Sequence, residues 1–242
     1  MVGLADEGML YKAKETLHVF ATRRPSIGTL LDNRTQVFDR IHAILPSTAT
    51  TGEELTLTLQ AWDQCERLIE DFEGRLHLET TDDAAAIPET VRFPPDNDGL
   101  ATLPDVRFES PGVQYVTVTH EGTGQRFVTN PVRVTADEPG YHLYWGDLHL
   151  HSTLSDGSGM LVDGFRFGRD VMQLDVVAYA DHDTMGFFIP PSLQRRRMHA
   201  RYFDRLKDVV AAFHDPDEFV TLLAYEWTKQ PNVGGHINVY FD

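Results

Sequence analysis

The chain has 242 residues, of which 41% are hydrophobic and 24% charged, with 18 Gly, 13 Pro and one Cys. This composition is ordinary for a globular protein and excludes collagen-like, low-complexity and disulfide-stapled classes. Acidic residues outnumber basic ones 37 to 21, and the net charge of −16 disfavours a nucleic-acid partner. Because the sequence contains no long apolar run and no signal-peptide core, we expect a cytoplasmic protein without a membrane partner.

The first part of the chain has the pattern of β-strands. Residues 1–35 are predicted to be an N-terminal extension with an edge strand. From Leu55 to Ala61 apolar and polar residues alternate, which is typical of a strand with one buried face. Residues 114–120 and 126–134 flank a glycine-containing connection that suits a hairpin. We therefore predict an antiparallel β-sandwich of immunoglobulin-like type over residues 36–137.

The second part alternates predicted strands with predicted helices. Candidate strands cover residues 142–150, 174–180, 219–225 and 236–241. Helices are predicted over residues 161–173 and from Ser192 to about Asp215. Nearly continuous apolar strands are typical of a parallel sheet that is buried on both faces. Residues 141–242 are therefore predicted to form an α/β domain, either doubly wound or a barrel.

A first group of polar residues lies at the end of the first of these strands. Asp147, His149 and His151 are spaced two residues apart, so their side chains are expected on the same side of the strand. Two imidazoles in this arrangement can hold one metal ion. Asp156 follows on a predicted turn that can fold its carboxylate back over the site.

Three more groups follow the next three strands. Asp181, His182 and Asp183 leave an apolar strand together, and such a run is costly to bury unless it is paired or metal-bound. Glu226 follows the third strand, and His236 follows two glycines at the start of the fourth. Mixed imidazole and carboxylate ligands suit Zn, Mn or Fe, and their number indicates two or three divalent ions.

Each group also has a simpler explanation. Two alternating histidines are common in ordinary strands, and Asp183 could cap a helix. Glu226 could pair with an arginine of the run Arg195–Arg197, which is itself typical of a solvated helix face. The occurrence of four such groups at four successive strand ends nevertheless favours a metal centre.

The motifs also resemble a known family. GDLHLHSTLSDG at 146–157, ADHDT at 180–184, AYEWT at 224–228 and GGHINVYF at 234–241 resemble the PHP (polymerase and histidinol phosphatase) superfamily. The resemblance is to an uncharacterised branch, labelled as a domain of unknown function, in which an all-β domain comes first. It implies a distorted (β/α)7, TIM-like barrel, of which residues 141–242 would be the N-terminal part, with the chain ending inside the barrel.

The resemblance also implies roles for individual residues. The implied metal ligands are His149, His151, Asp156, His182, Glu226 and His236. The implied catalytic residues among them are Glu226, His182 and Asp156. The carboxylates that would orient the ligating imidazoles are Asp147, Asp181 and Asp183. In this scheme Glu226 bridges two of the ions.

These observations together predict a metal-dependent hydrolase. A metal-activated water would attack a small phosphorylated substrate, since local cations can attract phosphate even to an acidic protein. Two alternatives remain open. The same centre could hydrolyse amides or esters, or the chain could be a non-catalytic binding or assembly module with an incomplete barrel.

Overall fold

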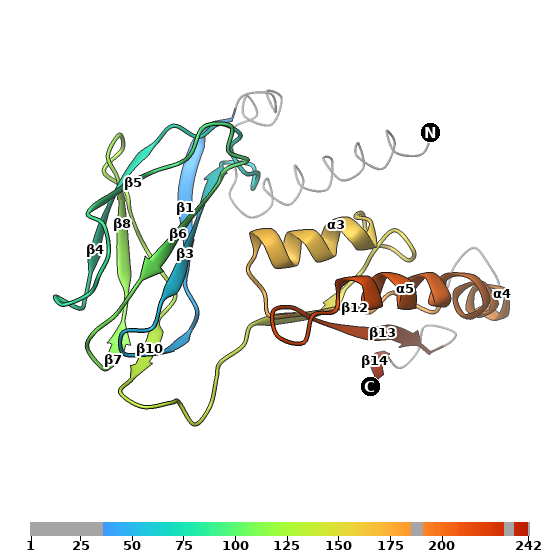
Figure 1. The fold of residues 1–242 in the computed structure, drawn as a ribbon. Helices are drawn as coiled ribbons and strands as arrows, with labels where there is room; N and C mark the ends of the chain where they lie inside the picture. Colours follow the sequence, from blue (N-terminus) through green and yellow to red (C-terminus); the bar gives the residue numbers. More distant parts are fainter. Residues whose placement is uncertain (1–35, 185–190, 230–234, 242) are drawn as a thin grey trace. The chain divides into compact units, whose positions relative to one another are not determined.

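The computed structural model describes residues 36–184, 191–229 and 235–241 (Figure 1). The predicted extension and edge strand at 1–35 lie outside the described residues. The described chain divides into two compact units between Leu143 and Tyr144, and each is described by itself. No described helix is long and apolar enough to span a membrane.

The first unit is built from ten short strands. They are β1 (Phe38–Ile44), β2 (Thr48–Thr50), β3 (Leu55–Asp63), β4 (Arg75–Thr80), β5 (Thr90–Arg92), β6 (Leu100–Val106), β7 (Gly112–Gln114), β8 (Val116–His120), β9 (Arg126–Val128) and β10 (Val132–Thr135). Their sheet orders are β1-β3-β6, β2-β10-β7 and β5-β4-β8-β9, and every pairing except β2 with β10 is antiparallel. Strands of these sheets face one another as the layers of a β-sandwich (Figure 1).

The alternation in the sequence predicts which residues of β3 are buried in the core of the sandwich, except that two polar residues are buried as well. Leu57 and Leu59 are fully buried, as the alternation predicts. Thr58 and Gln60 are buried as well, because β3 is the middle strand of its sheet and its second face is also covered. Gln60 tolerates burial because its side-chain oxygen accepts a hydrogen bond of 3.0 Å from Trp62 Nε1.

A buried carboxylate holds two loops of the sandwich together. Asp82 accepts hydrogen bonds from the backbone nitrogens of Ala84, Glu109 and Ser110, and from Ser110 Oγ at 2.7 Å. Burial raises the pKa of the Asp82 carboxyl, but the hydrogen bonds from Ser110, Ala84 and Glu109 outweigh burial and leave the pKa below its ordinary value. The ionised form of Asp82 therefore stabilises the fold.

We expect Asp82→Asn to lower the free energy of unfolding by roughly 1 to 3 kcal/mol at neutral pH, because an amide nitrogen cannot accept these bonds. A carboxyl with a lowered pKa stabilises above the pKa of the unfolded chain, and this stabilisation disappears as the pH falls through the folded pKa. Urea unfolding should show the gap to wild type closing below about pH 4. The exposed neighbour serves as control: Asp83→Asn should change little, and equal effects would contradict the assignment.

The second unit combines one sheet with helices. Its strands are β11 (Gly146–Leu150), β12 (Val176–Tyr179), β13 (Val220–Thr228) and β14 (His236–Phe241), in that spatial order. Its helices are α3 (Leu161–Arg166), α4 (Pro191–Arg197) and α5 (Phe203–Phe213), with π-helical turns at Phe167–Val171 and Met198–Tyr202. β11, β12 and β13 are parallel, and β14 is antiparallel to β13.

The two faces of this sheet differ. On one face Val177 and Tyr179 pack with Phe165 of α3 and Leu206 of α5 in an apolar core. The alternate residues of the strands, among them Ala178, Ala180 and Ala224, form a second small cluster of buried residues. This second face also carries Glu226, since it lies two residues beyond Ala224 on β13.

The predicted fold class of this unit is wrong. The described residues form an open four-stranded mixed sheet, not part of a distorted (β/α)7 or TIM-like barrel, and β14 does not continue the parallel order. The short connection between β13 and β14 explains why β14 is antiparallel. Only seven residues separate Thr228 from His236, whereas a crossover between parallel strands needs a dozen or more.

Candidate metal centre

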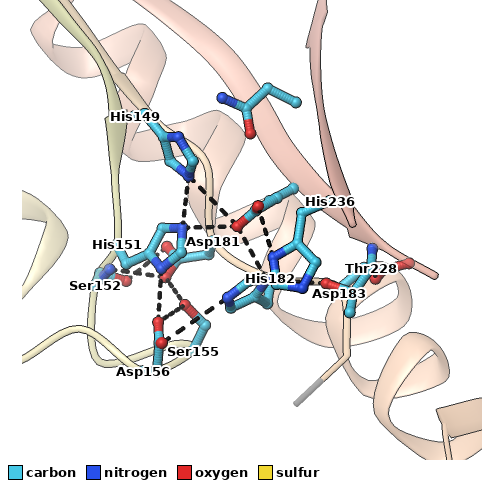
Figure 2. Close-up of polar contacts among 12 residues, drawn as sticks. His149, His151, Ser152, Ser155, Asp156, Asp181, His182, Asp183, Thr228 and His236 are labelled. Atoms are coloured by element: carbon cyan, nitrogen blue, oxygen red, sulfur yellow. Dashed lines mark hydrogen bonds and ion pairs between the residues drawn. The ribbon is translucent and has the colours of Figure 1, made fainter. Parts of the chain in front are cut away.

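The four predicted groups come together at one edge of the sheet. His149 lies on β11 and His151 directly after it, His182 follows β12, Glu226 is near the end of β13, and His236 begins β14. Parallel strands place their C-terminal ends at the same edge, and an antiparallel neighbour begins there. Figure 2 shows the rings of His149, His151, His182 and His236 gathered at this edge.

Glu226 is the centre of this arrangement. Its side chain is 4% exposed, and its Oε2 lies 3.0 Å from His151 Nε2 and 3.0 Å from His182 Nδ1. The same oxygen is 3.4 Å from His149 Nε2, while Oε1 is 2.8 Å from His236 Nδ1. One buried carboxylate thus meets four imidazole nitrogens. His149 Nε2 and His151 Nε2 are also only 3.1 Å apart, so two ring nitrogens share one small space.

The potential ligand atoms form three overlapping groups, in each of which they lie within 4.8 Å of one another. The groups are His149, His151 and Glu226; His151, Asp156 and His182; and His182, Glu226 and His236. This donor set of imidazoles and carboxylates fits Zn, Mn or Fe. All six predicted ligands are therefore brought together.

Asp156 lies on the loop after β11 and contacts two of the histidines. Its Oδ1 is 2.6 Å from His151 Nδ1, and its Oδ2 is 3.8 Å from His182 Nε2. Burial raises the pKa of Asp156, but the hydrogen bond from His151 and positive charge on His151 and His182 lower it more, so the net pKa is below the ordinary value. Asp156 is accordingly ionised at neutral pH.

The pKa of His182 is shifted in the direction that favours metal binding. Burial lowers its pKa, and positive charge on His151 and His236 lowers it further, against the opposite effect of Glu226 and Asp156. The net pKa is below the ordinary value. The neutral ring is therefore favoured, and a neutral imidazole is the form that binds metal ions.

Asp181 fixes the loop that carries Asp156. Asp181 is fully buried and accepts bonds from Ser152 N and Ser152 Oγ at 2.7 Å and from Ser155 Oγ at 2.6 Å (Figure 2). The same loop turns back so tightly that a Cβ at Gly157 would lie 2.0 Å from the His151 carbonyl oxygen. Only glycine allows this approach.

Asp183 fixes the end of β13. Its buried carboxylate accepts bonds from Arg195 Nε at 3.0 Å and from Thr228 N at 2.9 Å. Thr228 Oγ1 in turn lies 2.9 Å from His182 Nδ1. Arg195 also donates to the Thr228 carbonyl oxygen at 2.9 Å, so it holds the site together and is not part of a solvated helix face. Arg195 pairs with Asp183, and not with Glu226 as one alternative proposed.

The three carboxylates predicted to orient imidazoles have other contacts in the structure. Asp147 accepts from the backbone nitrogen of His149 at 3.1 Å, and Asp181 and Asp183 accept from the serine, threonine and arginine donors described above. They therefore act on the backbone around the ligands. Sequence reasoning did not find their partners Ser152, Ser155 and Thr228, because no periodicity or spacing marks a serine hydroxyl or a backbone N–H that bonds to a carboxylate far away in the sequence.

Comparison with known protein families finds no match for the chain. An uncharacterized protein of Chlamydia trachomatis serovar D is 24% identical over 219 residues, which cover 87% of this chain and 32% of that protein. An uncharacterized protein of Chlamydia pneumoniae is 23% identical over 213 residues, covering 85% and 31%. The chain spans about a third of the length of these relatives.

Solved structures are similar only in part. The D00-D0 domain of intimin matches 41% of this chain and 50% of its own, with 14% identity and a TM-score of 0.32. Domains 4 and 5 of the S-layer protein SbsC match 42% of this chain and 54% of their own, with 18% identity and a TM-score of 0.32. Scores this low carry no argument about the function of this chain.

The resemblance to the PHP superfamily is wrong. No protein family matches the chain, the similar proteins are uncharacterised, and the described sheet is open and mixed and not part of a barrel. Short motifs around ligands describe strand ends, and strand ends of this kind can be built on unrelated sheets. The roles of the site residues therefore rest on their geometry alone.

We expect Asp181→Asn to loosen the loop at residues 152–157, because one of its side-chain atoms would no longer accept a hydrogen bond in a fully buried position. Hydrogen exchange measured by mass spectrometry should show faster exchange of the Ser152 amide and its neighbours. The matched control is Asp217→Asn, an exposed carboxylate in the loop before β13. Unchanged protection of the 152–157 peptide would contradict the role given to Asp181.

Proposed function

We propose that this chain is a metal-dependent hydrolase whose centre binds two divalent cations, with Zn, Mn and Fe as the candidates. The observation that carries the proposal is the buried Glu226 carboxylate, both of whose oxygens face imidazole nitrogens at 2.8 to 3.4 Å. A buried carboxylate surrounded by imidazole nitrogens would bind divalent cations well, whereas a buried carboxylate with no compensating charge or donor is costly.

The ring nitrogens favour two ions over three. His149, His151 and Glu226 would hold one ion, and His182, His236 and Glu226 the other. A neutral imidazole has one lone pair, so His151 cannot serve a further ion through Nδ1 while Nε2 ligates. Its Nδ1 lies 2.6 Å from Asp156, which is the arrangement of a carboxylate that orients a ligating histidine.

Hydrolysis is the reaction that suits this centre, because of the chemistry of the ions, the fixed positions of the ligands and the access from solvent. Bound divalent cations polarise a substrate oxygen and lower the pKa of water toward neutrality. The chain itself holds the ligands at fixed positions, keeps His182 neutral and leaves one side open. His149 and His236 are 50% and 42% exposed, so a substrate can reach the ligands from solvent. A small phosphoester fits best, because paired cations can hold both the attacking and the leaving oxygen of a phosphoryl group.

We expect Glu226→Ala and His149→Ala to lose bound metal and hydrolytic activity together. Metal content would be measured by elemental mass spectrometry, and activity with p-nitrophenyl phosphate and p-nitrophenyl acetate side by side. Asp208→Asn, an exposed carboxylate on α5, is the matched control and should keep both. Full metal content in Glu226→Ala would overturn the centre. Turnover of the acetate alone would replace the phosphoesterase by an esterase or amidase.

We expect Asp156→Asn to retain the ability to bind two ions but with an affinity roughly 10 to 100 times lower, the usual cost of removing a group that orients a ligating histidine. Titration with Zn²⁺ or Mn²⁺ against a competing chelator would measure this. If wild type binds three ions per chain and Asp156→Asn binds two, Asp156 is instead a ligand of a third ion.

A further inference from the structure

Asn238 of β14 lies beside the centre but is not among its potential ligands. In the register of β13 and β14, Asn238 pairs with Glu226, and Thr228 pairs with His236. Directly paired residues of antiparallel strands place their side chains on the same face. Asn238 therefore shares the face of Glu226, between His236 and Tyr240 along β14.

A chain of hydrogen bonds fixes the orientation of the Asn238 carboxamide. Tyr240 Oη donates to the carbonyl oxygen of Leu148 at 2.8 Å, and Asn238 Nδ2 donates to Tyr240 Oη at 3.0 Å. A carbonyl oxygen can only accept, so the tyrosine hydrogen is used there and its oxygen must accept from Asn238. The amide nitrogen of Asn238, and not its oxygen, therefore faces Tyr240. The anchor also lies one residue before the ligand His149.

The second N–H of Asn238 remains available in the described contacts. Three other described donors near the centre already have partners: Ser155 donates to Asp181, Arg195 donates to Asp183 and to the Thr228 carbonyl oxygen, and Thr228 Oγ1 contacts His182. The potential ligands would use their lone pairs on cations. The amide of Asn238 therefore offers a substrate rich in oxygen atoms a preoriented neutral donor beside the centre.

We propose that Asn238 is a substrate-positioning residue, whose second amide N–H binds an oxygen of a phosphoryl group held at the centre. The inference rests on the proposed function. A fixed donor of this kind stabilises charge on a substrate oxygen without having to reorient during the reaction. Tyr240 contributes by holding the amide, and it does not touch the substrate.

The test uses the metal-loaded chain and inorganic phosphate as the probe. Isothermal titration calorimetry should show phosphate binding about 10 to 100 times more weakly to Asn238→Ala than to wild type, the range for a lost hydrogen bond to a charged group. Metal content should stay the same. Asn238→Asp, which keeps the side-chain volume, should weaken binding at least as much, because its carboxylate repels phosphate.

Two further variants separate positioning from support of the fold. Tyr240→Phe removes the anchor but keeps the amide donor, so it should weaken phosphate binding less than Asn238→Ala. Ile237→Ala lies on the opposite face of the same strand and should leave binding unchanged. If Tyr240→Phe weakens binding as much as Asn238→Ala, the pair is a structural tie and the inference is overturned.

Three other outcomes would also test the role of Asn238. Phosphate affinity that is unchanged in Asn238→Ala, with metal retained, would overturn the role of Asn238 and leave the proposed function standing. Loss of metal in Asn238→Ala and Asn238→Asp alike would assign the residue to the metal centre and not to the substrate, and so would also overturn the inference. A wild-type chain that binds metal but no phosphate would overturn both the inference and the phosphoesterase.

Discussion

The structure of the second unit depends on compensating one buried charge. Glu226 is nearly inaccessible to solvent, and a carboxylate in such a position needs cations or several hydrogen-bond donors. Its described ion-pair partners are four imidazoles. Arg195, a cationic side chain at the same end of β13, is committed to Asp183 and to the Thr228 carbonyl. Four neighbouring imidazoles that were all protonated would repel one another, and the lowered pKa of His182 reflects that repulsion in addition to burial. The metal ions that we propose would satisfy both constraints, because they would neutralise Glu226 and accept the lone pairs of neutral rings.

The topology of the sheet is what allows four segments to reach this charge. His151 and His182 follow the ends of parallel strands, which lie at the same edge. His236 arrives at that edge from the opposite direction, because β14 is antiparallel and its first residue pairs with Thr228 near the end of β13. The short connection that prevents a parallel crossover is thus also what places His236 opposite His182, with a ring-to-ring distance of 4.7 Å.

The sequence was sufficient to find the residues that the structure brings together, and insufficient to find the contacts that support them. Alternation of residues at His149 and His151, and ionisable residues leaving apolar strands, could be recognised because they depend only on local periodicity. The direction of β14 could also have been predicted from the length of its connection, but the motif resemblance favoured a barrel instead. The partners of Asp181 and Asp183 could not be predicted, because a serine hydroxyl or a backbone N–H that bonds across 26 to 45 residues has no local signature. The burial of both faces of β3 was missed for the same reason, since it depends on which strands become its neighbours.

The supporting contacts explain how such a centre can be ready before any cation binds. Asp181 attaches the loop of Asp156 to the end of β12 through three donors, and Asp183 attaches the end of β13 to the segment after β12. Both carboxylates are buried and use neutral donors or one arginine, so their bonds are shielded from solvent and salt. Because these loops are already fixed, cation binding would not have to offset the conformational entropy of ordering them. The segments that carry the candidate ligands are therefore held by bonds of Asp181 and Asp183, which are not among these ligands, so a cation would meet loops whose positions are already fixed.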